Sequence, residues 1–177
     1  MTLTPRLRKL ALTAHVTCSV GWLGAVAVFL ALGVAGLTSQ DVQVVRAAYL
    51  TMDWAGWFVL VPLAVASLLT GLIQSLGTHW GLFRHYWVLA KLLINLFATI
   101  VLLLYMQTLG SLGRLAADTT LSTDDLGVLR SPSPVLHAGA ALLLLLVAAG
   151  LAVYKPRGMT RFGRKHHERR TVPVSQP

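Results

Sequence analysis

Residues 10–40, LALTAHVTCSVGWLGAVAVFLALGVAGLTSQ, form an uncharged and mostly apolar run. A helix needs about 20 such residues to cross the hydrocarbon core of a bilayer. The run exceeds that length, and it is also much longer than the 7–15 residue apolar core typical of a cleaved signal peptide. It therefore predicts a retained membrane-spanning helix.

Three further apolar runs cover residues 54–83, 92–113 and 131–154. Only 12% of the 177 residues are charged, whereas about 25% are charged in average soluble proteins. The pattern predicts an all-α integral membrane four-helix bundle over residues 1–156, with a basic, flexible tail over 157–177. The expected helices cover about 7–37, 53–76, 85–109 and 134–155.

The net charge of +9 is unevenly distributed. Cations cluster before the first run, between the second and third, and after the fourth: Arg6, Arg8, Lys9, Arg84, Lys155, Arg157, Arg161, Arg164, Lys165, Arg169 and Arg170. The other two loops hold three arginines and five of the six acids. By the positive-inside rule, both termini are expected in the cytoplasm and the chain in the plasma (inner) membrane. The tail is expected to bind anionic lipid head groups rather than nucleic acid.

Two features concern the second helix and the loop that precedes it. Pro62 removes a backbone hydrogen bond and predicts a kink there. Val42, Val45, Arg46 and Tyr49, in the expected outer loop at 38–51, are spaced as on a helix. This spacing predicts a short helix lying on the outer membrane surface.

Polar residues within the first and third runs are the main candidates for chemistry. His15, Cys18, Ser19 and Trp22 share one helix face, because their offsets are close to whole helical turns. At 1.5 Å per residue, His15 lies about 12 Å from the cytoplasmic start of its helix. Lys91 lies about 9 Å from the start of the third helix. Both are therefore expected at nearly the same depth in the inner leaflet.

Simpler interpretations stay open for each of these residues. His15 could only bond a carbonyl of a neighbouring helix, Lys91 could extend to the head groups, and Cys18 could only pack. His79 and His85 could join His15, or could belong to an interfacial aromatic belt.

His137 lies at the opposite mouth of the bundle. There Asp53 and Tyr49 are its candidate partners by depth. This placement leaves open a second, outer site.

The residue types absent from the spans exclude several kinds of catalytic and binding site. The chain has no HExxH motif, no glycine-rich phosphate loop and no paired intramembrane acids. The available ligands favour a cofactor or metal ion held by neutral imidazole, alone or with an amine.

Two short segments resemble known families. His15, six residues, then Trp22-Leu-Gly24 resembles the opening of CopD-type copper-resistance proteins and HemJ-type protoporphyrinogen oxidases. Tyr86-Trp87-Val-Leu-Ala-Lys91-Leu-Leu resembles a later helix of the HemJ type, although Met106 stands where that type tends to have histidine. The whole chain resembles actinobacterial four-helix membrane proteins of unassigned function.

The HemJ resemblance implies haem b with His15 and Lys91 as axial ligands, and Trp22 beside it. The CopD resemblance implies copper, with His15, Cys18, Met52 and Met106 as candidates. The leading hypothesis is an intramembrane haem- or metal-binding redox protein, an oxidase or electron carrier using Cu, Fe or Zn. Its candidate metal ligands are His15, Cys18, His79, His85 and His137, and its substrate a quinone or another hydrophobic molecule. Alternatives are a copper-handling or small-solute transporter and a structural or assembly protein; homo-oligomerisation stays open.

Overall fold

The computed structural model describes residues 4–77, 82, 85–118, 120, 122–156, 158 and 160. Helical segments follow one another along this part of the chain: α1 (Pro5–Thr38), α2 (Val42–Ala55), η1 (Gly56–Leu60), α3 (Val61–Gly77), α4 (Tyr86–Ala117), α5 (Thr123–Leu129) and α6 (Ser133–Tyr154). Among the described residues, four helices are long and apolar enough to cross a membrane: α1, α2 to α3, α4, and α5 to α6. The fold is therefore all-α, as predicted, and the chain is a multi-pass membrane protein.

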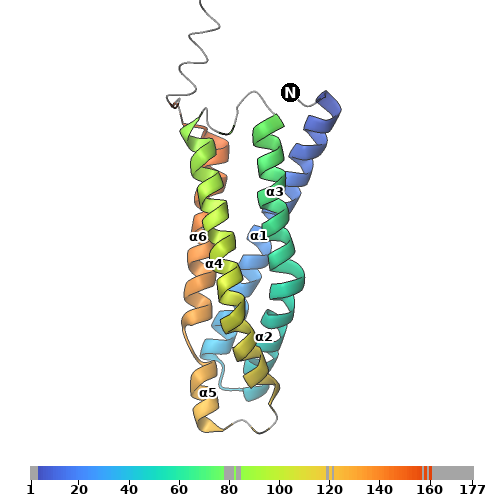
Figure 1. Ribbon diagram of the computed structural model, residues 1–177. Coiled ribbons are helices and arrows are strands. Elements are labelled where there is room, and N and C mark those ends of the chain that lie inside the picture. The colour runs from blue at the N-terminus through green and yellow to red at the C-terminus, as the bar shows by residue number, and fades with distance from the viewer. Residues whose placement is uncertain are drawn as a thin grey trace, which may run out of the picture.

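The spanning helices form an elongated bundle in which α1 begins and α6 ends at the same end (Figure 1). We call this the terminal end. Helix α1 packs against α2, α3 and α6, and α4 packs against the same three, so α1 and α4 lie diagonally across the bundle. Many large apolar side chains point outward, including Leu104, Leu136 and Leu143, each 66% exposed. Such a surface suits lipid rather than water.

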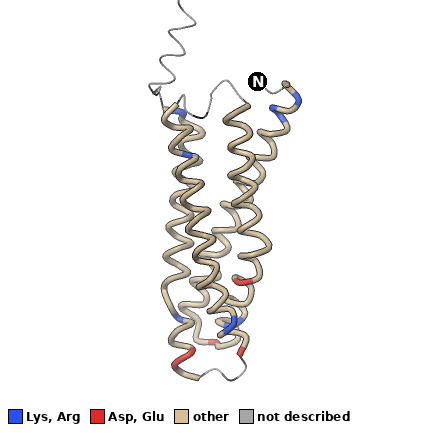
Figure 2. Tube along the Cα trace, in the orientation of Figure 1, with Lys and Arg blue, Asp and Glu red and all other residues tan. Residues whose placement is uncertain are grey.

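The charges of the described residues differ between the two ends (Figure 2). The terminal end carries only cations, namely Arg6, Arg8, Lys9, Lys91 and Lys155, whereas the acids lie toward the opposite end. This separation matches the charge pattern from which the topology was predicted.

The second spanning helix begins at Val42 rather than near Asp53, so the predicted surface helix is instead its first turns. The Asp41 side chain caps it by accepting a bond from the Gln43 N–H at 2.8 Å. Val45 and Tyr49 are fully buried rather than lying on a surface. Further along, the distortion expected at Pro62 takes the form of the π-helical turn η1, which directly precedes the first turn of α3.

Helix α4 continues to Ala117, beyond the predicted end near residue 109. Gly110 and Gly113, which favoured a loop in the sequence, allow α2 to approach α4 closely. A Cβ atom added at Gly113 would lie 2.8 Å from Cβ of Asp53. Arg46 donates to the carbonyls of Ala116 and Ala117, at 2.9 and 3.3 Å, and so satisfies the C-terminal end of α4.

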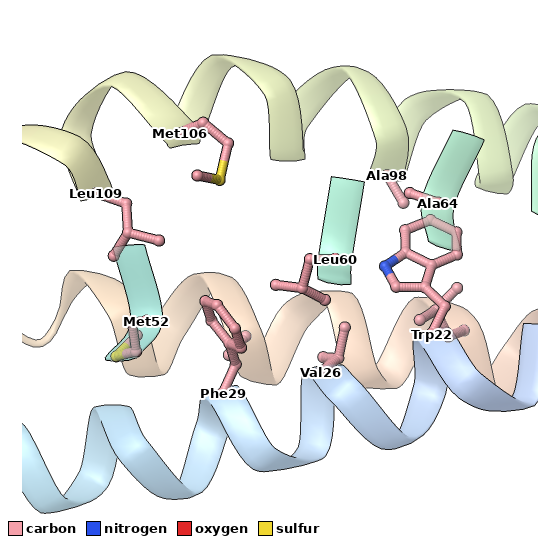
Figure 3. Packing of buried hydrophobic residues seen from close by; sticks show 11 residues of the cluster. Trp22, Val26, Phe29, Met52, Leu60, Ala64, Ala98, Met106 and Leu109 are labelled. Atoms are coloured by element: carbon pink, nitrogen blue, oxygen red, sulfur yellow. The ribbon is translucent and has the colours of Figure 1, made fainter. Parts of the chain in front are cut away.

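The apolar core lies in the middle and the opposite half of the bundle (Figure 3). It contains Trp22, Val26 and Phe29 from α1 together with buried residues of every other spanning helix. A second cluster, around Tyr49 and Leu129, fastens α5 to the opposite end, where the Tyr49 hydroxyl donates to the Leu129 carbonyl.

Gly113→Ala is expected to destabilise the bundle by about 1–3 kcal/mol, because the added methyl group overlaps the Asp53 side chain. Gly139→Ala on α6 is the matched control, since its added Cβ would have no neighbour within 4 Å. Thermal unfolding in detergent, followed by circular dichroism, compares the two variants. Equal unfolding midpoints would contradict the tight α2–α4 contact.

Candidate functional site

The His15 side chain projects from α1 onto α3. Its Nδ1 lies 3.1 Å from the Ser67 carbonyl oxygen and 3.2 Å from the Thr70 hydroxyl. The ring packs on Gly71, where an added Cβ would lie 3.0 Å from Cε1. A small residue at position 71 is therefore what admits the imidazole between the helices.

The hydrogen-bond partners of His15 determine its tautomer. A carbonyl oxygen only accepts, and the Thr70 hydroxyl already donates to the Ala66 carbonyl at 2.6 Å. Nδ1 therefore carries the hydrogen, and in the neutral ring the lone pair is on Nε2. The described residues supply no hydrogen-bond partner for Nε2.

Ser67 connects this histidine to two further polar residues. Its side chain is 1% exposed, and its hydroxyl lies 2.9 Å from that of Ser19 on α1 and 3.3 Å from the amide nitrogen of Asn95 on α4. We call His15, Ser19, Ser67, Thr70 and Asn95 the polar cluster. It joins α1, α3 and α4 within the apolar bundle.

Lys91 is not the residue of α4 that reaches the cluster. Its ammonium lies 5.0 Å from the centroid of the Trp87 ring, a cation–π distance. Asn95, one turn further along the helix, makes the bond to Ser67 instead. Helices α1 and α4 lie diagonally in the bundle, and no hydrogen bond joins His15 to Lys91 in the described structure, although the charge of Lys91 lies close enough to act on the imidazole.

The other predicted ligands are dispersed. Cys18 is a half-buried free thiol one turn from His15. His85 precedes α4, with its ring centroid 6.3 Å from that of Trp87, and His79 lies outside the described residues. Among the described residues no group of three or more His, Cys, Asp or Glu side chains is placed to hold a metal ion.

His137 forms a separate arrangement in the opposite half. Its ring stacks on Tyr105, with centroids 4.0 Å apart and planes 18° from parallel. Its Nδ1 donates to the Ser133 carbonyl at 2.9 Å, and the Tyr105 hydroxyl lies 3.3 Å from the Ser133 hydroxyl.

The partners that the sequence suggested for His137 make other contacts. Tyr49 bonds the Leu129 carbonyl, and Asp53 lies against Gly113. The Oδ1 atom of Asp53 is buried without a partner in the described part of the chain.

A cavity of about 220 Å³ lies between α1, α4 and α6, with contributions from α2 and η1. The lining is almost entirely apolar, and it includes three residues whose side chains also carry a polar group, Trp22, Tyr105 and His137. His15 and Lys91 do not line it. The structure thus separates two features, the polar cluster toward the terminal end and the cavity in the middle and opposite half.

Ser67, Thr70 and Asn95 are the cluster members that the sequence did not identify as partners of His15. Asn95 had a signal, since an amide in an apolar run needs a partner inside the protein. Ser67 fitted a small-residue packing stripe equally well, and Thr70 had no distinguishing signal.

Comparison of the chain with models of protein families, with curated proteins and with solved structures finds no match. The resemblance to CopD- and HemJ-type proteins therefore stays a prediction based on short motifs.

Ser67→Ala is expected to lower the unfolding free energy in detergent by about 1 kcal/mol, because Ser19 and Asn95 lose their shared partner. Ser75→Ala is the control, since within the described residues that hydroxyl bonds only the Gly71 carbonyl of its own helix, at 2.7 Å. Chemical unfolding followed by helicity measures both variants. A Ser67→Ala protein as stable as Ser75→Ala would contradict a stabilising role for the cluster.

Proposed function

We propose that this protein is an intramembrane redox protein, of oxidase or electron-transfer type, that binds a transition metal ion or haem b through His15. The observation that supports the proposal is the state of this imidazole. Its Nδ1–H donates to the Ser67 carbonyl, and the lone pair of Nε2 stays available to bind a metal ion. Histidines that bind metals through one ring nitrogen usually donate a hydrogen bond from the N–H of the other nitrogen to a carboxylate, carbonyl or water in this way.

The described contacts fit a metal ion better than a haem held by both His15 and Lys91. The Lys91 ammonium lies over the Trp87 ring, and neither His15 nor Lys91 lines the cavity. For a metal ion, His15 supplies one imidazole and Cys18 a thiol on the same face of α1. His85 is a further predicted ligand, and His79 lies outside the described residues. Imidazole with thiolate suits copper, zinc or iron.

Residues of the chain would prepare this site without touching the metal. Ser67 and Thr70 fix the tautomer and orientation of the imidazole, and Gly71 leaves room for its ring. A bound metal ion or haem would supply one-electron chemistry in a region from which the bundle excludes water.

His15→Ala is expected to remove bound metal or haem. Protein purified in mild detergent would be analysed for Fe, Cu and Zn and by oxidised and reduced visible spectra. His137→Ala is the control, because that residue lies in the opposite half of the bundle and should leave the content unchanged. Wild-type protein that holds neither stoichiometric metal nor a chromophore, after expression with ample metal and haem precursor, would refute the proposal.

Two observations favour second candidates. His137, like His15, donates through Nδ1 to a carbonyl and leaves Nε2 available, so one accessible imidazole lies in each half, as copper handling or small-solute transport would need. The hydrogen-bonded polar cluster would also serve a structural or assembly protein without cofactor. Metal bound equally by His15 and His137 would favour transport, and no metal at all would favour the structural role.

We further place both termini in the cytoplasm, with the basic tail on anionic lipid. A fluorescent protein fused after Pro177 should fluoresce, and alkaline phosphatase fused after Ser122 should be active, because that enzyme folds only outside the cytoplasm. A silent fluorescent fusion with an inactive phosphatase fusion would contradict this topology and place both termini outside the cytoplasm.

A further inference from the structure

The indole N–H of Trp22, in the middle of the bundle, makes no hydrogen bond to the described residues. The side chain is only 1% exposed, yet its nitrogen is not one of the fully buried atoms that lack a partner in the described structure, so this atom borders open space. A buried indole N–H usually has a partner, because leaving it unpaired costs free energy. Figure 3 shows the indole nitrogen on the edge of the ring that faces Leu60. Trp22 and Leu60 both line the cavity.

The cavity gives this donor a place for a ligand. At about 220 Å³ it is smaller than the pockets of roughly 300–1,000 Å³ that hold drug-sized molecules, so it suits a single substituted ring. Its lining includes Phe97 and Ala140, which are exposed on the outer surface of α4 and α6. The cavity is therefore accessible from the lipid between these two helices.

The surroundings of Trp22 restrict the chemistry of the ligand. The neighbouring lining residues Val26, Leu60 and Ala98 are apolar and offer no side-chain acceptor or counter-charge. A hydroxyl group placed there would bring a hydrogen without an acceptor, and a charged group would be costly to bury. A carbonyl oxygen accepts from the indole and donates nothing.

We infer that this cavity is a binding site for a lipid-soluble quinone, with one carbonyl oxygen accepting the Trp22 N–H and the prenyl tail passing between α4 and α6. Apolar and aromatic walls bury the ring, and Tyr105 and His137 belong to the lining at the other end of the cavity. This inference goes beyond the proposed metal site, and it does not require that His15 bind a metal.

Two small molecules of the same shape separate the hydrogen bond from simple cavity filling. Duroquinone and durene are both tetramethylated six-membered rings, but only duroquinone has carbonyl groups. The indole N–H of Trp22 and the methyl group of Met52, which also lines the cavity, would be observed by NMR in detergent micelles. Trp22→Phe and Met52→Leu assign these two signals among the five tryptophans and four methionines.

Duroquinone is expected to shift both signals saturably, whereas durene shifts only Met52 and binds more weakly. In Trp22→Phe, the Met52 signal should report binding of duroquinone weakened about threefold to tenfold, the loss expected for one neutral hydrogen bond. Equal affinity for durene and duroquinone, or a Trp22 N–H that duroquinone leaves unshifted, would overturn the inference.

Ala141→Leu tests the location, because Ala141 lines the cavity and a larger side chain fills it. This variant should lose binding, whereas Ala149→Leu, at an exposed position of the same helix, should bind as the wild type does. Unaltered binding by Ala141→Leu would overturn the assigned cavity. If Ala141→Leu loses helicity, the affinity of Trp22→Phe for duroquinone tests the location instead. His15→Ala should leave duroquinone binding unchanged, so that failure of the metal site and of the quinone site are distinguishable.

Discussion

The bond from the His15 imidazole to the Ser67 carbonyl is the interaction around which the polar interior of this bundle is arranged. Lipid offers no hydrogen-bond partners, so a polar side chain within a span must find one inside the protein. Ser67 provides such partners to two helices at once. Its carbonyl accepts from His15 on α1, and its hydroxyl bonds Ser19 on α1 and Asn95 on α4. The resulting network joins α1 and α4 to α3.

A different constraint governs the opposite half, where glycines bring α2 and α4 together. Asp53 lies against Gly113 with one buried, unpartnered oxygen in the described structure, and Arg46 satisfies the last carbonyls of α4. These charged residues lie inside or beside a spanning helix rather than in a loop. The fold accommodates them because backbone carbonyls accept hydrogen bonds from Arg46 and a glycine leaves room for Asp53.

The helices could be predicted from the sequence, whereas most of the contacts between them could not. Length and hydropathy suffice to recognise a span, so all four were found, with α1 and α6 close to their expected bounds. The start of α2 and the end of α4 were misplaced because Asp41, Arg46, Gly110 and Gly113 are typical of loops. The pairing of His15 with Lys91 rested on depth alone. Depth follows from counting residues, whereas the diagonal placement of α1 and α4 depends on which faces pack together, which one sequence does not reveal.

Trp22 links the two halves of the molecule. It lies two turns from His15 on the same face of α1, about 10 Å along the axis at 1.5 Å per residue. Its ring lines the end of the cavity nearest the polar cluster, and its nitrogen lies on the ring edge toward Leu60, another lining residue. A redox centre on His15 and a quinone against Trp22 would thus share one helix face without sharing ligands. Such an arrangement would let electrons pass between them while each site keeps its own chemistry, imidazole and thiol for the metal and an apolar slot with one donor for the ring. The spacing of His15 and Trp22, visible in the sequence as one short motif, would then be the distance between two sites and not the outline of one.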